Sequence, residues 1–204
     1  MSHDTLIHRI VRPAIRRIAP TGVTPNQLTT VRLATGVAAA AGFACGGVWA
    51  DVGGVVFLVS MLFDRADGEL ARQTGQMSPA GHRYDLCVDC VADAIAFIGI
   101  GIGLAGAGLG IAPVLLGIAA GLGIGVLFWQ LNVLKVIELS RYAMRHRGVV
   151  IDPDDALALV PVFVWLGLSW PMLIAAAAIT PAAALWLGLL ARRPKPAAVP
   201  EVQK

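Results

Sequence analysis

Residues 64–72 read DRADGELAR and residues 81–89 read GHRYDLCVD, and each stretch adjoins an apolar run long enough to cross a membrane. Four carboxylates therefore stand where lipid would normally surround the chain: Asp64, Asp67, Asp85 and Asp89. A charged side chain at the centre of a membrane helix costs roughly 2.5–3.5 kcal/mol on insertion scales. Four together would cost on the order of 10 kcal/mol without a neutralising partner, so the cluster is typical of a metal site.

The composition around this cluster is that of an integral membrane protein. Hydrophobic residues make up 57% of the 204 residues, only 14% are charged, and mean hydropathy is +0.74. A crossing needs roughly 20 apolar residues, and the stretches of about this length predict an all-α bundle of six transmembrane helices. They are Leu28–Trp49, Val52–Arg72, Tyr84–Ala107, Pro113–Leu139, Ala156–Trp170 and Pro171–Ala191.

The charge distribution predicts the orientation of this bundle, because short cytoplasmic loops carry an excess of Lys and Arg. With six spans, most basic residues gather on one side, in segments 9–17, 65–83, 135–147 and 192–204. The opposite connections carry no basic residue: 45–51, 106–112 and 169–171. We therefore expect a multi-pass protein of the cell membrane, with both termini and the carboxylate cluster facing the cytoplasm.

The chain divides into three predicted segments. In residues 1–20, apolar residues recur at helical spacing beside several arginines, which predicts an amphipathic helix lying on the membrane surface. The alternative is a solvated basic tail; a signal peptide is not expected because the segment lacks an apolar core and a cleavage site. Residues 21–191 would form the six-helix membrane domain, and residues 192–204 a disordered basic tail in the cytoplasm.

The three cysteines do not predict a disulfide framework. Cys45, Cys87 and Cys90 are odd in number and lie in apolar sequence. The spacing of Cys87 and Cys90 is a weak signal for a zinc site, because the chain has no second such pair.

Glycines in the apolar stretches predict close helix packing. They recur at four-residue spacing in residues 99–125, which lets helices approach closely in lipid. These contacts form within one chain or between two, and the second possibility predicts a homodimer.

Helical spacing places the four carboxylates in two pairs, each on one helix face. Asp64 and Asp67 are three residues apart and Asp85 and Asp89 are four apart, so each pair projects from one side of its helix. If the connection at 75–81 sets the two helices side by side, the four converge in an all-oxygen site. Such ligands favour Mg²⁺ or Mn²⁺, and they suffice for two ions, an arrangement suited to phosphoryl chemistry.

Neighbouring residues fit the same chemistry. Gly68 has no side chain and leaves room for a ligand against the helix, and Arg72 offers a planar fork for phosphate oxygens. Asp93 continues the four-residue spacing after Asp89. It would either accept a hydrogen bond beneath the site or serve helix packing alone.

The complete spacing, D-x2-D-G-x2-A-R-x8-G-x3-D-x3-D, resembles the signature of the CDP-alcohol phosphotransferase family. All eight positions match: Asp64, Asp67, Gly68, Ala71, Arg72, Gly81, Asp85 and Asp89. The resemblance implies a six-helix membrane enzyme of phospholipid biosynthesis, usually dimeric. Such an enzyme transfers a substituted phosphoryl group, commonly from CDP-diacylglycerol, to an alcohol and releases CMP.

The resemblance also implies roles for individual residues. The metal ligands would be Asp64, Asp67, Asp85 and Asp89, and Asp89 would also be the base that takes the proton of the acceptor hydroxyl. The residues that would contact the CDP part of the donor match or border the signature, or begin the first helix. They are Gly68, Ala71, Arg72, Ser78, Gly81, Asn26 and Thr30.

A second group of charges follows the fourth predicted span. Lys135, Arg141 and Arg145 predict a basic pocket for an acceptor that carries a phosphate, such as inositol phosphate or glycerol phosphate. The alternative is the positive-inside bias together with attraction to anionic lipid.

The sequence leaves the identity of the acceptor alcohol open. Residues 152–155, DPDD, stand where a Glu-Arg-x2-Arg stretch is expected in synthases of phosphatidylinositol phosphate and phosphatidylglycerol phosphate, so unphosphorylated inositol or serine is a further alternative. The pair Gly68-Glu69 is similar to that of archaeal enzymes making di-inositol phosphate compounds. That similarity favours inositol phosphate and allows for a soluble donor.

Membrane carboxylates also mark ion pathways, so a cation or proton carrier is the competing hypothesis. A carrier needs neither Gly68 nor Arg72 beside its carboxylates, and its charges would lie at mid-membrane with access from both faces. A catalytically dead scaffold is disfavoured because every position that the chemistry requires is present.

Overall fold

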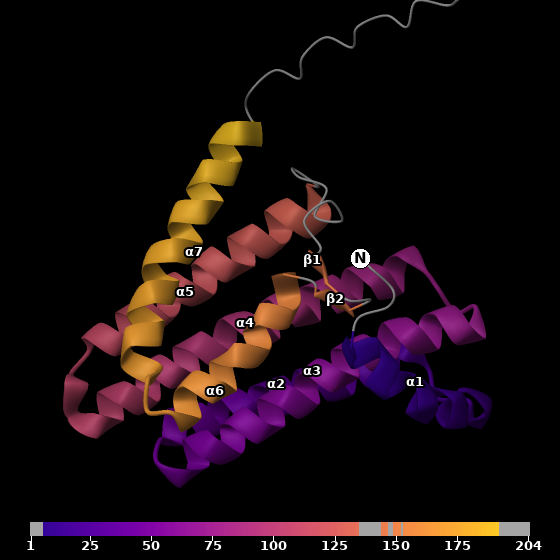
Figure 1. The fold of residues 1–204 in the computed structure, drawn as a ribbon, viewed down its shortest axis with the longest axis horizontal. Coiled ribbons are helices and arrows are strands. Elements are labelled where there is room, and N and C mark those ends of the chain that lie inside the picture. Colours follow the sequence, from indigo (N-terminus) through magenta and orange to yellow (C-terminus); the bar gives the residue numbers. More distant parts are fainter. Residues whose placement is uncertain (1–5, 135–143, 147–148, 152, 192–204) are drawn as a thin grey trace, which may run out of the picture.

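The computed structural model describes residues 6–134, 144–146, 149–151 and 153–191 as a bundle of helices with one small hairpin (Figure 1). The α labels mark α-helices and the η labels short 3-10 or π-helical turns. In chain order the elements are α1 (Leu6–Ile18), η1 (Ala19–Thr21), α2 (Pro25–Cys45), α3 (Val48–Thr74), α4 (Pro79–Leu104), η2 (Ala105–Leu109), α5 (Ala112–Phe128), η3 (Trp129–Val133), β1 (Met144–His146), β2 (Val149–Ile151), η5 (Pro153–Ala158), α6 (Leu159–Trp165) and α7 (Ser169–Ala191).

Four helical segments among the described residues are long and apolar enough to cross a membrane: Pro25–Cys45, Pro79–Leu109, Ala112–Asn132 and Ser169–Leu189. These are the helices of an integral membrane protein, as the composition predicts. The other two predicted spans do not meet this standard. α3 is 27 residues long but carries the charged motif in its C-terminal half, and the apolar helical stretch that includes α6 covers only Ala156–Trp165.

Several boundaries differ from those expected, and glycines explain the differences. The first span is expected to end at Trp49, but α2 ends at Cys45 because Gly46 and Gly47 take positive φ angles of 69° and 53°. The fifth span is expected to be a helix from Ala156 to Trp170. Instead the helix α6 has seven residues, and a turn with Gly167 at φ 71° leads into α7.

A small hairpin accompanies the helices of the predicted all-α fold. β1 and β2 pair antiparallel, with Arg145 opposite Val150. Three consecutive β-branched residues, Val149, Val150 and Ile151, favour the extended backbone of β2. The expected disordered tail at 192–204 lies outside the described residues.

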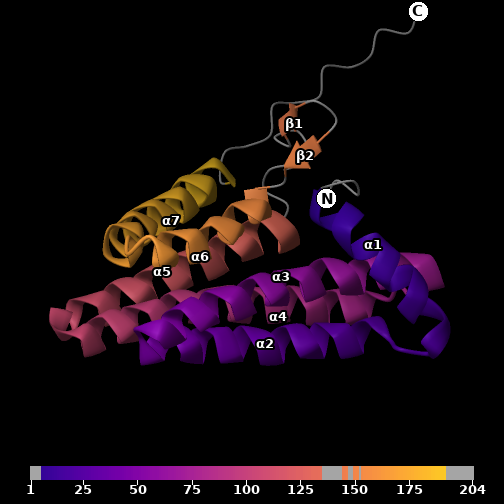
Figure 2. The ribbon, with the colours of Figure 1, turned by 60° about the horizontal axis from the view of Figure 1, so that its bottom comes forward.

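The core of the bundle is a layer of three long helices, α2, α3 and α4, which run alongside one another (Figure 2). α2 packs along both α3 and α4, whereas α3 and α4 touch each other only sparsely. α5 packs on α4, α7 on α5, and α6 on α3. The charged halves of α3 and α4 can therefore face each other without being in close contact.

Glycines bring α2 and its neighbours together at one end of this layer. A Cβ atom on Gly53 of α3 would lie 2.8 Å from the carbonyl oxygen of Ala39 in α2, and one on Gly42 would lie 2.8 Å from the Cα of Gly53. On α4, a Cβ on Gly99 would meet the carbonyl of Ala40. The close approach predicted from the glycine spacing at 99–125 is thus made inside one chain at Gly99, and Gly42 and Gly53 make a further close approach.

The N-terminal helix α1 packs on the charged end of α3 (Figure 2). Val11 and Ile15 are buried in a small apolar cluster with Leu28 of α2 and Leu70 of α3. An ion pair between Arg12 Nε and Glu69 Oε1, at 3.2 Å, joins the same two helices. The predicted amphipathic helix is present over Leu6–Ile18, and these two apolar residues are buried against the bundle.

Candidate active site

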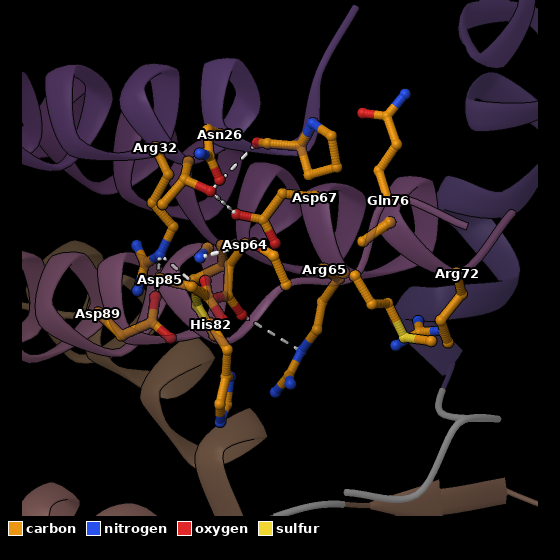
Figure 3. A pocket seen from close by; sticks show the side chains of 18 of the residues that line it. Asn26, Arg32, Asp64, Arg65, Asp67, Arg72, Gln76, His82, Asp85 and Asp89 are labelled. Carbon is orange, nitrogen blue, oxygen red and sulfur yellow. Dashed lines mark hydrogen bonds and ion pairs between the residues drawn. The ribbon is translucent and has the colours of Figure 1, made fainter. Parts of the chain in front are cut away.

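A cavity of about 490 Å³ lies at the end of the α2–α3–α4 layer that carries the charged motif (Figure 3). Residues of these three helices and of the α3–α4 connection line it, together with Phe128 of α5 and Leu157 of η5. Five carboxylates line the cavity: Asp64, Asp67, Asp85, Asp89 and Asp93. The four predicted from the motif are thus brought together, and Asp93 joins them.

Three of these carboxylates form a tight group. One ligand oxygen each of Asp64, Asp85 and Asp89 lie within 4.8 Å of one another. Asp85 Oδ1 is buried and has no hydrogen-bond partner among the described residues. Carboxylates this close repel one another unless a cation lies between them, so an all-oxygen group with a buried oxygen left unsatisfied fits a divalent metal ion.

Asp67 stands beside this group rather than in it. Its side chain is buried, and its Oδ2 accepts a hydrogen bond of 2.6 Å from Thr29 Oγ1 on α2. It lines the same cavity. The structure therefore divides the four predicted carboxylates into a group of three and a fourth, Asp67, which is hydrogen-bonded to α2.

The main feature that the motif spacing does not predict is the position of Arg32 of α2. The side chain is 3% exposed and reaches into the carboxylates (Figure 3). Its nitrogens form ion pairs with Asp89 at 2.7 Å, Asp93 at 3.2 Å and Asp64 at 3.3 Å. A signal existed: an arginine eight residues into an apolar helix needs a buried partner.

A second buried arginine approaches the group from α3 itself. Arg65 Nε lies 3.5 Å from Asp64 Oδ2. His82 and Gln76 also line the cavity, from α4 and the α3–α4 connection (Figure 3). The motif spacing singled out none of these three.

Six of the seven residues expected to contact the CDP part of the donor line the cavity: Asn26, Gly68, Ala71, Arg72, Ser78 and Gly81. Thr30 is not among the lining residues. Its Oγ1 bonds the backbone oxygen of Asn26 at 2.8 Å and lies 3.0 Å from Tyr84 Oη. Thr29, one position earlier, lines the cavity, because consecutive residues of a helix point in different directions.

Two helix starts form the rim of the cavity where Asn26 and Ser78 lie. α2 begins with a capping box, in which Thr24 Oγ1 accepts from the Gln27 backbone and the Gln27 side chain accepts from Thr24. α4 begins with Ser78 Oγ accepting from the Gly81 backbone at 3.0 Å. A Cβ on Gly81 would lie 3.0 Å from Asn26 Oδ1, so this glycine lets the two helix starts approach.

Around Gly68 the wall is open, since a Cβ there would meet only the Arg72 guanidinium within 4 Å, at 3.5 Å. Arg72 lines the cavity and pairs with Glu69 Oε2 at 2.9 Å. Glu69 also accepts from Gln73 Nε2 at 2.9 Å and pairs with Arg12 of α1. The guanidinium expected at the phosphates is therefore held by an acidic side chain at the edge of the cavity.

The sequence predicts three residues that bind the acceptor. Lys135 and Arg141 lie outside the described residues. Arg145 lies in β1, where its backbone pairs with that of Val150 in β2.

A family model described as CDP-alcohol phosphatidyltransferase matches residues 22–190 of the chain. The chain belongs to the CDP-alcohol phosphatidyltransferase family. The match runs from the residues before α2 into the last turns of α7, so it includes the whole cavity. The family resemblance drawn from the eight-residue signature is confirmed, and with it, at the level of the family, the transferase class.

Among curated proteins, this member of the CDP-alcohol phosphatidyltransferase family is similar to the archaetidylinositol phosphate synthase of Pyrococcus horikoshii. The identity is 31% over 98 residues, which is 44% of this chain and 51% of that protein. The matched region thus spans about half the length of the relative.

Solved structures of Mycobacterium tuberculosis phosphatidylinositol phosphate synthase share the fold. The structure with CDP-DAG bound has a TM-score of 0.63 at 21% identity and covers 90% of both chains. The structure in complex with manganese and citrate has a TM-score of 0.58 at 22% identity, covering 86% of this chain and 87% of that one. The helical architecture of a membrane enzyme in this family is therefore established for the chain.

Proposed function

We propose that this protein transfers a phosphatidyl-type group from a CDP-linked donor to the hydroxyl of a small phosphorylated alcohol and releases CMP in phospholipid biosynthesis. The observation that carries the proposal is the gathering of Asp64, Asp85 and Asp89 within 4.8 Å. The cavity that holds them is also lined by Gly68 and Arg72, as the family signature requires. Membership of the family supports the same reaction.

Asp64, Asp85 and Asp89 are assigned to one metal ion, and Asp67 beside them to a second. Mg²⁺ or Mn²⁺ bound there would neutralise the pyrophosphate and stabilise the departing oxygen of CMP. The carboxylate-only donor set and the unsatisfied Asp85 Oδ1 support a hard divalent ion. The relative crystallised with manganese supports the same class of ion.

Asp89 is assigned as the base. The acceptor oxygen attacks the donor phosphorus that carries the alcohol group, its proton passes to Asp89, and the bond from that phosphorus to CMP breaks. Arg72 and the start of α4 at Ser78 and Gly81 would face the nucleotide and its phosphates. A phosphate would compete with Glu69 for the Arg72 guanidinium, since both are anions that bind its planar fork.

A lipid-linked donor such as CDP-diacylglycerol is favoured over a soluble one. A second cavity, of about 690 Å³, has an almost wholly apolar lining from α4, α5, η5, α6 and α7. Leu157 lines both this cavity and the one with the carboxylates. A donor with its pyrophosphate at the metal ligands would therefore have an apolar space next to it for an acyl chain.

For the acceptor we favour inositol phosphate, because the two named relatives are an archaetidylinositol phosphate synthase and a phosphatidylinositol phosphate synthase. Lys135, Arg141 and Arg145 would bind its phosphate. Lys135→Ala or Arg141→Ala should then raise the acceptor KM about 10-fold or more and leave the donor KM within about twofold, as expected for loss of a charged hydrogen bond. Equal increases for both substrates would argue for a general electrostatic role instead.

For the topology we propose six spans, with α3 and the joined helical stretch of η5 and α6 added to the four apolar segments, and both termini in the cytoplasm. α3 is about 40 Å long at roughly 1.5 Å per residue, which exceeds the hydrocarbon core. Residues 1–20 would lie on the membrane surface, 21–191 form the catalytic domain and 192–204 a tail. In intact cells, an impermeant thiol reagent should label Cys45 and fail to label a single-cysteine variant carrying Met77→Cys; the reverse would overturn this orientation.

The oligomeric state proposed is a homodimer. Sedimentation of the purified protein in detergent, corrected for bound detergent, should give twice the chain mass of 21.3 kDa. A species of one chain mass at all concentrations would contradict it.

The function itself is tested by CMP release from purified protein with Mg²⁺ and CDP-diacylglycerol, offering inositol phosphate, glycerol phosphate, inositol and serine in turn. Release that depends on inositol phosphate is the expected result. Silence with all four acceptors, combined with no metal-dependent binding of CDP, would overturn the proposal and favour an ion carrier.

A further inference from the structure

We propose that Arg32 is a positioning residue for the transfer step, which fixes the orientation of Asp89 by holding one of its two oxygens. This inference rests on the function proposed above, in which Asp89 accepts the proton of the acceptor. The family signature begins at Asp64 and does not include Arg32, which lies on another helix.

Each nitrogen of the guanidinium bonds a different acceptor, on α3 or α4. Nε donates to Asp89 Oδ1 at 2.7 Å, Nη1 to Ser60 Oγ at 3.0 Å, and Nη2 to Asp93 Oδ1 at 3.2 Å. Ser60 Oγ in turn donates to the backbone oxygen of Arg32 at 3.0 Å. The side chain is thus fixed in its plane and along its length, so it can fix its partners.

Burial makes this arrangement sensitive to each partner. Ser60 is 0% exposed, Arg32 3% and Asp93 5%. A buried guanidinium without acceptors would be strongly unfavourable, and carboxylates without a cation likewise. Asp93 balances part of the charge of Arg32. Of the two roles considered for Asp93, a hydrogen-bond acceptor beneath the site and helix packing alone, this contact favours the first.

The consequence for Asp89 follows from its two oxygens. Oδ1 is held by Arg32 Nε at 2.7 Å, a shorter distance than those from Arg32 to Asp93 and Asp64, which leaves Oδ2 as the oxygen for a metal ion or the acceptor hydroxyl. Without Arg32 the carboxylate could rotate, and repulsion from Asp64 would drive it to do so. A lysine would keep the charge but lose the fork that reaches three acceptors at once.

The test compares a charge-balanced double variant, Arg32→Gln with Asp93→Asn, and the single variant Arg32→Lys with the wild-type protein. Removing one cation and one anion together avoids an unpaired buried charge, so the double variant should fold. Arg83→Gln is the control, because Arg83 is an exposed arginine of α4 that does not line the cavity. Readouts are kcat, donor KM, and thermal stabilisation by Mn²⁺ alone.

In both test variants kcat should fall about 10- to 100-fold, the usual effect of losing a residue that orients a ligand. Donor KM should stay within about twofold of wild type, and Mn²⁺ should still raise the melting temperature, because Asp64 and Asp85 remain. Arg83→Gln should behave as wild type.

The inference is overturned if the double variant is folded and keeps wild-type kcat, or if Arg32→Lys restores the full rate, since charge alone would then suffice. It is also overturned if the rate falls only in proportion to the folded fraction, with stabilisation by Mn²⁺ lost, which would make Arg32 a structural clamp. An inactive wild-type protein would instead refute the proposed function on which the inference depends.

Discussion

The two ends of the α2–α3–α4 layer are built from the same helices and differ in what lies between them. At the end around Gly42 and Gly53, backbone meets backbone, and an added Cβ would lie 2.8 Å from the facing helix. At the other end, carboxylates and three arginines line a cavity of about 490 Å³. α3 changes from one kind of packing to the other within its 27 residues.

The comparison shows how a bundle of membrane helices can accommodate buried charged side chains at one of its ends. Glycine contacts maximise packing at one end, where lipid gives helices no hydrophobic reason to associate. That packing keeps the three helices in register. At the other end, charged side chains face the space between the helices, and the carboxylates are balanced by Arg32 from α2 and Arg65 from α3.

The largest expected effect is at the charged end. Asp89→Asn should lower kcat for CMP release about 10²- to 10⁴-fold, the usual loss for a general base, while binding of the CDP donor is largely kept. The matched control is Asp51→Asn, on an exposed aspartate near the glycine end of the same layer. Full activity in the Asp89 variant would sink its assignment as the base.

The next effect tests the glycine end. Gly53→Ala should lower the free energy of unfolding by about 1–3 kcal/mol, because the new methyl group would press on backbone atoms of α2 that cannot move aside. Thermal unfolding in detergent measures it. Gly106→Ala is the control, since no atom lies within 4 Å of a Cβ there. If both variants melt alike, the close packing inferred for this end is not important.

A third prediction sharpens the division among the carboxylates. Asp64→Asn should weaken Mn²⁺ binding about 10-fold or more, whereas Asp67→Asn should leave the first ion in place, because Asp67 stands outside the group of three and is held by Thr29. Mn²⁺ titration followed by thermal shift separates the two variants. Equal losses would show that all four carboxylates act on one ion.

The smallest effect is expected where α1 joins the charged end. Arg12→Gln should reduce stability by less than about 1 kcal/mol, because the Arg12 side chain is 35% exposed and such pairs are screened by water. Glu69 keeps Arg72 and Gln73 as partners. Chemical or thermal unfolding checks this, and a loss of several kcal/mol would mean that α1 is integral to the core.

Much of the candidate site could be predicted because it lies on local spacing. Asp64 and Asp67 share one helix, and Asp85 and Asp89 share the next, so a period of 3.6 residues is enough to group each pair. Prediction failed where the outcome depended on the direction of a side chain from its helix or on contacts between residues far apart in the sequence. Thr29 rather than Thr30 lines the cavity, and Arg32 meets Asp89 across 57 positions of sequence.

By itself, the sequence determined the membrane class, the family signature and the clustering of acidic residues, since each depends on composition or on neighbours within two or three helical turns. Only the tertiary structure decided that Asp67 stands apart from the other three, that Arg32 sits among the carboxylates, and that α6 has seven residues. These outcomes depend on which helix packs beside which. That choice is made by glycine contacts and buried ion pairs between distant segments, and no periodicity within one segment encodes it.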